Sequence, residues 1–150
     1  MALLKIYTGE DPVLRKKARK ITKIGKKLRT LAKDMLETMY HANGVGLAAP
    51  QVGISERLVV IDVGSGPIVL INPEIIKKEG ENRDVEGCLS LPGRSEYVTR
   101  ADRVIVAAYD LNGKKINLTG EGLLARAFQH EIDHLNGILF IDHLNNTKEQ

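Results

Sequence analysis

The sequence lacks the cysteines that a disulfide-framed protein requires. Cys88 is the only cysteine among its 150 residues, so no disulfide can form within the chain. A small secreted protein held together by disulfides is therefore excluded. A lone thiol is typical of a reducing compartment, and we expect a cytoplasmic protein.

Aromatic residues and long apolar runs are also scarce. The chain has no tryptophan, two phenylalanines and four tyrosines, too few for a module that stacks nucleic-acid bases on aromatic side chains. Its apolar runs, such as residues 68–71, are far shorter than the roughly 20 residues that span a bilayer. The first residues do not lead from a charged start into a long apolar stretch. We therefore expect neither a secretory signal nor a membrane partner.

The overall composition is that of an ordinary globular protein. Hydrophobic residues make up 43% and charged residues 27% of the chain, which excludes a disordered chain, a collagen and a coiled coil. No repeat, low-complexity segment or linker rich in proline, glycine or serine interrupts the sequence. A chain of this length typically forms one domain, so we expect a single domain over residues 1–150.

Positive charge is concentrated near the N-terminus. Residues 1–30 contain ten lysines or arginines and two acids, a net charge of +8, whereas residues 31–150 have a net charge of −5. The basic run from Arg15 to Arg29 has the charge to contact phosphate groups. The more common interpretation of such a run is a solvated helix surface.

The clearest helix signal covers Lys26–Ala42. Its apolar residues recur at the spacing of one helix face and form a single stripe. These residues are Leu28, Leu31, Ala32, Met35, Leu36 and Met39. Asn43 and Gly44 tolerate positive φ angles and are expected to end the helix. Asp11 and Pro12 suit a cap and a first turn, and they predict a shorter, earlier helix.

Four apolar or β-branched runs predict strands between this helix and a second one. They cover residues 58–63, 68–76, 104–109 and 114–118. Pro73 is expected to mark a bend or an edge. Asn112-Gly113, between the last two runs, is a strong hairpin signal.

The second helix is expected over residues 120–136, with Thr119 as its N-cap and Gly137 as its stop. The predicted strands are grouped between the two helices rather than alternating with further helices. This arrangement indicates an α+β fold rather than a doubly wound parallel sheet.

The second helix carries a candidate metal site. His130 and His134 are four residues apart, so both imidazoles lie on one helix face and can bind the same ion. Glu131 follows the first histidine and completes the HExxH pattern, in which the glutamate acts as general base. A chance match has odds of roughly one in several hundred in a chain of this length.

A catalytic metal site also needs a third protein ligand. Asp142, His143 and Glu149 follow the helix, at spacings that match no known arrangement. Cys88 precedes it, and a thiolate is a strong ligand for borderline-soft ions. A lone cysteine is, however, more often a small buried hydrophobic residue.

Three segments together resemble the peptide deformylases. They are GVGLAAPQ at residues 44–51, EGCLS at residues 86–90 and QHEIDHL at residues 129–135. The similarity extends from Asp11 to Phe140, and three ordered motifs are far more specific than HExxH alone. The resemblance implies a metal-dependent hydrolase that removes the N-formyl group from the N-terminal formylmethionine of nascent polypeptides and releases formate.

The resemblance also implies a fold and a set of reactive residues. We expect mostly antiparallel strands packed around a central helix that bears HExxH, with an N-terminal amphipathic helix, in one catalytic domain. Cys88, His130 and His134 would bind the metal and Glu131 would be the catalytic carboxylate. The side-chain amide of Gln51 and the backbone N–H of Leu89 would stabilise the oxyanion. The family uses Fe²⁺ in the cell, and Zn²⁺, Ni²⁺ or Co²⁺ can replace it in isolated protein.

Several further residues are candidates for binding the substrate or supporting the site. Leu123 and Ala127 share the helix face of the ligands and, with Val45, would form an apolar slot for methionine; core packing explains them equally well. The full set of expected substrate-binding residues is Val45, Gly46, Glu86, Leu123, Arg126 and Ala127.

Charged and polar residues near the motifs are expected to orient the ligands. Glu86 would pair with Arg100 or Arg103, and the resemblance favours Arg100. Gln129 and Asp133 would support the ligands from the helix; exposure on its surface is the alternative.

The expected partners are an N-formylmethionyl peptide and, transiently, the ribosome, with no specific nucleic-acid sequence, and we expect a monomer. Many deformylases carry a further C-terminal helix implicated in ribosome docking, whereas this sequence ends about ten residues after Phe140. Two alternatives remain: a HExxH peptidase with another third ligand, and a non-enzymatic module that binds RNA through the basic N-terminal region. Loss of metal on replacing Cys88 would exclude the first, and metal-free, salt-dependent RNA binding would support the second.

Overall fold

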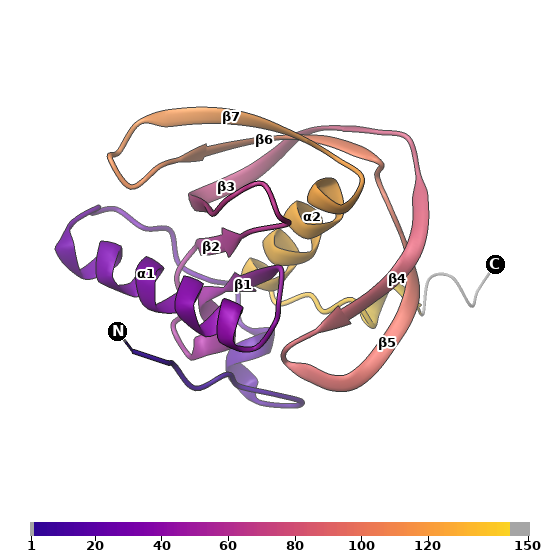
Figure 1. Cartoon of the computed structure of the whole chain (residues 1–150), viewed down its shortest axis with the longest axis horizontal. Helices are drawn as coiled ribbons and strands as arrows, with labels where there is room; N and C mark the ends of the chain where they lie inside the picture. The colour runs from indigo at the N-terminus through magenta and orange to yellow at the C-terminus, as the bar shows by residue number, and fades with distance from the viewer. Residues whose placement is uncertain (1, 145–150) are drawn as a thin grey trace.

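The computed structural model describes residues 2–144, and its main element is a five-stranded antiparallel sheet (Figure 1). In order across the sheet, the strands are β1 (Gly46–Ala48), β2 (Leu58–Ile61), β3 (Ile68–Glu79), β6 (Arg103–Tyr109) and β7 (Lys115–Glu121). The other elements are a hairpin of β4 (Asn82–Cys88) and β5 (Leu91–Arg100), the helices α1 (Lys26–His41) and α2 (Leu123–Leu135), and the short 3₁₀ helices η1 (Pro12–Arg15) and η2 (Ala49–Val52). Antiparallel strands with few helices make this an α+β fold.

Strand β2 is apolar along its whole length because both of its faces are covered. Leu58 and Val60 pack in the cluster beneath α1, together with Met35. Val59 and Ile61, on the opposite face, pack in the cluster around α2. The centre of the main sheet therefore lies between the two helices.

Helix α1 buries most of the stripe that the sequence predicts, and Leu31 and Leu36 are only partly buried. Leu28, Ala32, Met35 and Met39 are buried on one side of it, and the helix ends at His41. Asn43 adopts a positive φ of 58° and turns the chain toward β1. This turn brings the residues after the helix to the edge of the sheet, where the cavity described below begins.

Helix α2 is buried on almost every side and lies between the main sheet and the β4–β5 hairpin (Figure 1). Phe128, Ile132 and Leu135 pack against the sheet. On the hairpin side, Arg126 donates hydrogen bonds to Glu86 and to the carbonyl of Val98. The helix that carries HExxH is thus held from two sides. No helix within residues 2–144 is long and apolar enough to cross a membrane.

The structure differs from the sequence predictions at several boundaries. Thr119 does not cap α2, because β7 continues to Glu121 and pairs Thr119 with Ile105. The helix begins one turn later, after Gly122, whose φ is 57°. Strand β3 runs past Pro73 to Glu79, with a shift in its pairing with β6 at the proline. The predicted bend is therefore an irregularity within one long strand.

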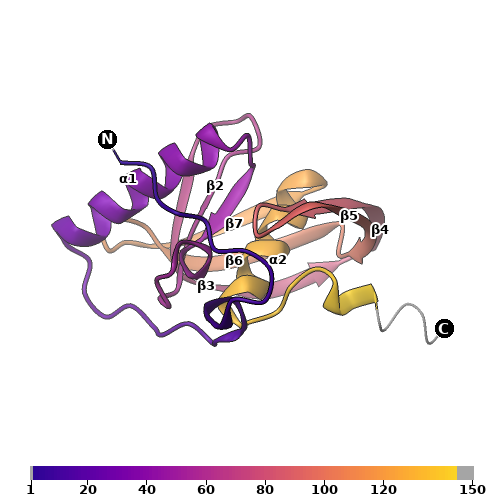
Figure 2. The same ribbon diagram turned by 90° about the horizontal axis from the view of Figure 1, so that it is seen from below.

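The basic N-terminal run is mostly not helical. Arg15 ends η1, residues 16–25 have no regular secondary structure, and α1 begins at Lys26. The helix expected for this run is therefore wrong for residues 16–25, although the lysines and arginines of this stretch are exposed to solvent. This segment follows the outside of the molecule between α1 and the C-terminal end of α2 (Figure 2), where the N–H of Ala18 donates to the carbonyl of Leu135.

Candidate active site

Cys88, His130 and His134 come together although they lie far apart in the sequence. Cys88 is the last residue of β4, and the two histidines are one turn apart on α2. One potential donor atom from each lies within 4.8 Å of the others. The Sγ atom of Cys88 is 3.3 Å from Nε2 of His134. A thiolate and two imidazoles form a donor set that fits a divalent transition-metal ion.

Glu86 fixes the orientation of His130. Its Oε1 atom lies 2.8 Å from Nδ1 of His130, which leaves Nε2 of the ring for an ion. Arg100 donates two hydrogen bonds to Glu86, at 2.9 and 3.1 Å, and Arg126 donates one at 3.0 Å. Burial alone would raise the pKa of Glu86, but the hydrogen bonds from His130 and Arg100 lower it to about 2. Glu86 is therefore a carboxylate at neutral pH.

The electrostatics of the two histidines also suit a cation. Burial alone would lower the pKa of His130, but the charge of Glu131 and hydrogen bonds to Cys88 and Glu86 raise it to about 10. Burial and the nearby charge of His130 lower the pKa of His134. The surroundings thus attract one positive charge to His130, and a metal ion competes with a proton for that position.

Glu131 lies beside the three potential ligands without joining them. Its Oε2 atom is 4.0 Å from Nε2 of His130, and its Oε1 atom is buried with no hydrogen-bond partner among the described residues. Burial raises the pKa of Glu131 to about 7. A carboxyl group that titrates near neutral pH can both accept and return a proton.

Gln51 reaches the same place from η2. Its side chain is buried, and Nε2 lies 3.6 Å from the Sγ atom of Cys88. Leu89, the residue after Cys88, lines the same cavity. The structure thus brings both residues that were expected to stabilise an oxyanion next to the thiol.

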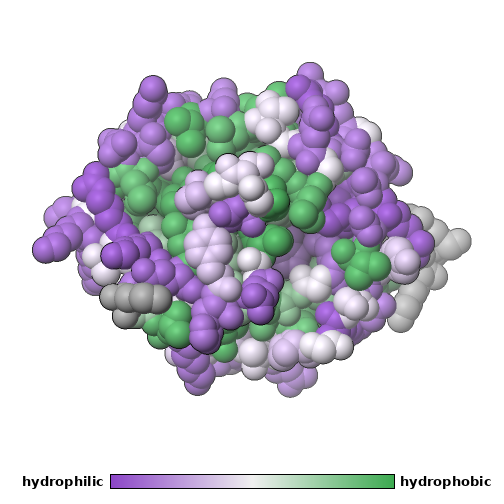
Figure 3. All heavy atoms as spheres, in the orientation of Figure 1, coloured by the Kyte–Doolittle hydropathy of each residue, from purple (hydrophilic) through white to green (hydrophobic). Residues whose placement is uncertain are grey.

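Most of these residues line an open cavity of about 640 Å³, whereas His134 is buried outside its lining. Val45, Leu123 and Ala127 line it together with His130 and Glu131. Val45 and Leu123 are 43% and 54% exposed, so they are surface residues rather than core residues. On the face shown in Figure 3, apolar side chains gather toward the middle and hydrophilic ones toward the rim. A cavity with a polar floor and apolar sides suits a peptide with an apolar side chain.

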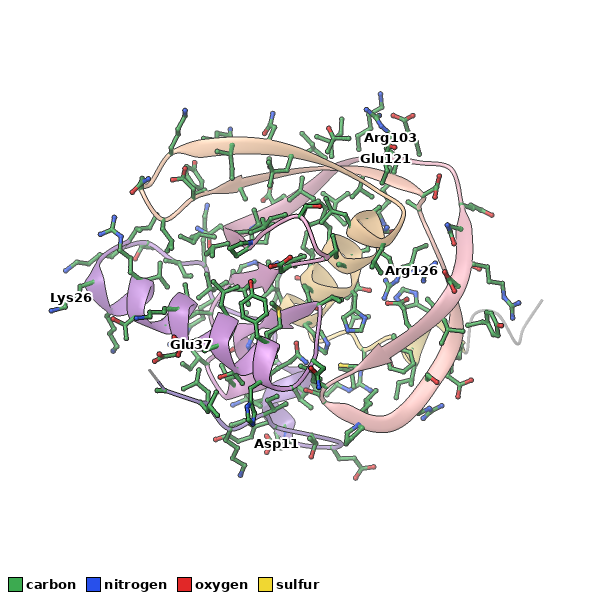
Figure 4. The ribbon with its side chains drawn as sticks, viewed as in Figure 1. Asp11, Lys26, Glu37, Arg103, Glu121 and Arg126 are labelled. Atoms are coloured by element: carbon green, nitrogen blue, oxygen red, sulfur yellow. The ribbon has the colours of Figure 1, made fainter. Side chains whose placement is uncertain are left out.

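Two residues expected to bind substrate contact each other instead. The charged group of Arg126 points from α2 toward the β4–β5 hairpin (Figure 4). It is bonded to Glu86, to Val98 and to the carbonyl of Asn82. Glu86 and Arg126 border the cavity, but their polar atoms hold β4 and β5 against α2.

The two residues expected to support the ligands from α2 act at a distance from them. Asp133 lies 2.6 Å from Arg100 and 2.9 Å from His143, so it reaches His130 only through Arg100 and Glu86. Gln129 exchanges two hydrogen bonds with the backbone of Ala101. It holds the segment next to Arg100 rather than a histidine.

The other candidates for a third ligand lie elsewhere. Asp142 accepts a hydrogen bond from Arg15, and His143 contacts Asp133. Glu149 is outside the described residues. The sequence interpretation gave no role to Ser90, although its segment was singled out; it is fully buried and accepts a hydrogen bond from Gln51.

Comparisons with known proteins agree with this arrangement. A sequence model of the polypeptide deformylase family matches residues 3–150. A peptide deformylase of Alkaliphilus metalliredigens is 60% identical over 142 residues, covering 95% of this chain and 97% of the relative. A peptide deformylase structure from Legionella pneumophila has a TM-score of 0.92 and 51% identity, over 95% of this chain and 86% of that one. A Met-Ala-Ser-bound class I type b peptide deformylase of Acinetobacter baumannii has a TM-score of 0.91 and 34% identity, over 95% and 98% of the two chains. The chain belongs to the polypeptide deformylases, a family of enzymes.

Proposed function

We propose that this enzyme removes the formyl group from the N-terminal formylmethionine of nascent polypeptides and releases formate. The observation that carries the proposal is the convergence of a Cys/His/His donor set, two members of which line one open cavity, with Glu131 and Gln51 in the same lining. Each group has a task in the hydrolysis of an unreactive formamide.

Cys88, His130 and His134 would hold one divalent ion, Fe²⁺ in the cell. The hydrogen bond between Nδ1 of His130 and Glu86 supports this assignment because it directs Nε2 toward the other two donors. When bound, such an ion supplies a Lewis acid that makes water a better nucleophile and polarises the formyl oxygen.

Glu131 moves the proton in this proposal. It would accept a proton from the attacking water and deliver it to the leaving amine. The position of Glu131 supports this role, because its Oε1 atom is buried with no hydrogen-bond partner among the described residues and its Oε2 atom lies 4.0 Å from Nε2 of His130.

Gln51 and Leu89 would stabilise the negative charge that develops on the formyl oxygen. The Nε2 atom of Gln51 already lies beside Cys88, and Leu89 follows that cysteine directly. Removing one such donor typically costs about 2.7–4 kcal/mol of transition-state stabilisation.

The apolar side of the cavity would bind the methionine side chain. Val45, Leu123 and Ala127 offer a slot for a flexible, polarizable thioether. Gly46 lies beside them on the edge strand β1, where a substrate backbone can approach closely. The Met-Ala-Ser complex of the relative from Acinetobacter baumannii supports a methionyl peptide as ligand.

The enzyme would act as a cytoplasmic monomer that meets its substrate at the ribosome. All nine lysines and arginines between residues 15 and 29 are exposed. They lie along η1, the irregular residues 16–25 and the start of α1, where they are available to contact ribosomal RNA. We propose that part of this basic segment, defined as residues 15–29, makes a weak electrostatic contact.

The direct test compares formyl-Met-Ala-Ser with its acetyl analogue, using protein purified without oxygen and analysed for metal. The proposal predicts formate release from the first peptide and no product from the second. Cleavage of internal peptide bonds without formate release would favour the alternative HExxH peptidase and contradict the proposal.

A further inference from the structure

Gln51 can serve as a donor only if its amide faces the cavity with nitrogen rather than oxygen. The two ends of a glutamine amide have nearly the same shape, so the surrounding hydrogen bonds decide its orientation. Here Oε1 of Gln51 accepts the backbone N–H of Ala48 at 2.9 Å. A backbone N–H can only donate, so oxygen must lie on that side.

The nitrogen end of the same amide is held by Ser90. Nε2 of Gln51 lies 3.1 Å from Oγ of Ser90. Ser90 is 0% exposed and Gln51 is 1% exposed, so water does not replace this bond. An amide nitrogen carries two hydrogens. With one directed to Ser90, the other faces the cavity side, where Nε2 donates to Sγ of Cys88 at 3.6 Å.

The backbones of these two residues are joined by the N-terminal segment. The N–H of Tyr7 donates to the carbonyl of Gln51 at 2.7 Å, and the N–H of Gly9 donates to the carbonyl of Ser90 at 2.8 Å. Two residues from separate elements, η2 and the turn between β4 and β5, are thereby held at a fixed separation. The hydroxyl and the amide meet because both backbones are fixed.

We propose that Ser90 is a positioning residue that aims the Gln51 amide at the reacting carbonyl. Its hydroxyl occupies one Nε2 hydrogen and fixes the plane of the amide, so that the second hydrogen points to where the oxyanion forms. Preorganised donors of this kind stabilise a transition state without reorganising during the reaction. The inference rests on the proposed function, since it assigns Ser90 to the donor used there.

The first test measures kcat and KM of Ser90→Ala on formyl-Met-Ala-Ser. Loss of a single orienting hydrogen bond should lower kcat about tenfold, and KM and metal content should stay unchanged because Ser90 touches neither the substrate slot nor the metal donors. Ser65→Ala, an exposed serine in the loop between β2 and β3, is the matched control and should leave kcat unchanged. An unaltered kcat in Ser90→Ala would overturn the inference.

The decisive test combines Ser90→Ala with Gln51→Ala. If Ser90 acts through Gln51, the Ser90 change should have no further effect once the amide is gone, so the double variant should match Gln51→Ala. Equal tenfold losses in both backgrounds would show that Ser90 acts by another route and would overturn the inference. If Ser90→Ala does not fold, Ser90→Cys can replace it in the same comparison with Gln51→Ala, because a thiol has a similar size but is a weaker hydrogen-bond acceptor.

Failure of the inference is distinguishable from failure of the proposed function. If the wild-type protein releases formate and the losses in Ser90→Ala and Gln51→Ala add in the double variant, only the role of Ser90 is rejected. Wild-type protein loaded with metal that releases no formate rejects the proposed function, and the inference falls with it.

Discussion

At the residue scale, the site depends on the absence of a side chain at Gly46. A Cβ atom built on Gly46 would lie 2.5 Å from Oε2 of Glu131 and 3.0 Å from its Cδ. The carboxylate therefore occupies space that any other residue would fill. Gly46 was expected to let the substrate backbone approach, and the structure gives it a second task, which is to leave room for the catalytic carboxylate.

Gly46→Ala should therefore displace Glu131 and lower kcat by about 100-fold, the typical cost of moving a catalytic group by about 1 Å. The backbone at Gly46 has no positive φ angle, so folding should be largely retained. The matched control is Gly25→Ala, where a Cβ atom meets only the end of Lys23 at 4.0 Å. The measurement is steady-state kinetics on formyl-Met-Ala-Ser, with thermal melting to check that the variant is folded. A preserved kcat would contradict this account.

Glu131→Gln tests the proton transfer itself. The amide has nearly the same shape but cannot accept the proton, so turnover should fall by 10²–10⁴-fold, the usual contribution of a general base. Metal content should remain that of wild type, because Glu131 is not among the three donors. Glu121→Gln, an exposed glutamate on β7, is the control. A near wild-type rate in Glu131→Gln would remove Glu131 from the mechanism.

At the element scale, the end of α2 is held by a close contact with η1. Gly137 follows the helix with a φ of 74°, and a Cβ atom at this position would overlap the backbone carbonyl of Arg15. The side chain of Arg15 in turn reaches Asp142 at 2.6 Å. The stop predicted for Gly137 is thus also the point where the N-terminal segment packs against the helix that bears the histidines.

Gly137→Ala should be more destabilising than a conformational penalty alone explains. Gly9 has a similar φ of 65°, but a Cβ atom there meets nothing within 4 Å. Gly9→Ala should cost about 1–2 kcal/mol, the penalty of a left-handed conformation, and Gly137→Ala should cost clearly more. Urea denaturation of both variants measures the difference, and equal losses of unfolding free energy would contradict the close packing.

The elements also show which parts of the site the sequence could predict. The positions of His130, Glu131 and His134 relative to one another follow from helix geometry. The position of Cys88 does not, because it depends on the β4–β5 hairpin, whose β4 is largely polar and exposed and gives no clear strand pattern. Cys88 was one of several candidates for the third ligand, and the family resemblance selected it.

Long-range polar contacts were the other limit of sequence reasoning. The direction of the Arg126 side chain depends on the register of the hairpin, since Glu86, Asn82 and Val98 all come from it. Helix spacing alone placed Arg126 on the substrate side. The strand signals were more local: they located β2, β3, β6 and β7 but missed the three-residue β1 and both strands of the β4–β5 hairpin.

At the scale of the whole molecule, charge is unevenly distributed. The basic segment, residues 15–29, holds nine lysines and arginines and no acid. Changing Lys16, Lys17, Lys20 and Lys23 to Gln should weaken co-sedimentation with ribosomes at low salt, because each phosphate contact adds about −0.7 to −0.9 to the log–log salt slope. Activity on a free formyl tripeptide should not change, since these lysines have no role in the chemistry.

A second fourfold variant controls for net charge alone. Lys77, Lys78, Lys114 and Lys115 are also exposed, and changing them to Gln removes the same charge elsewhere. Equal loss of ribosome binding by both variants would show that overall charge, not the basic segment, is responsible. Unchanged binding by the first variant would reject the proposed contact.

The central claim is that one ion held by Cys88, His130 and His134 enables hydrolysis of a formyl peptide in this cavity. The most direct measurement is formate release from formyl-Met-Ala-Ser as Ni²⁺ is added to metal-free protein, for wild type and for Cys88→Ala. The account predicts that wild-type activity rises linearly and stops rising at one equivalent of ion per chain, and that Cys88→Ala neither retains the ion nor gains activity. Full activity of the metal-free protein, or of Cys88→Ala with a stoichiometric ion, would contradict it.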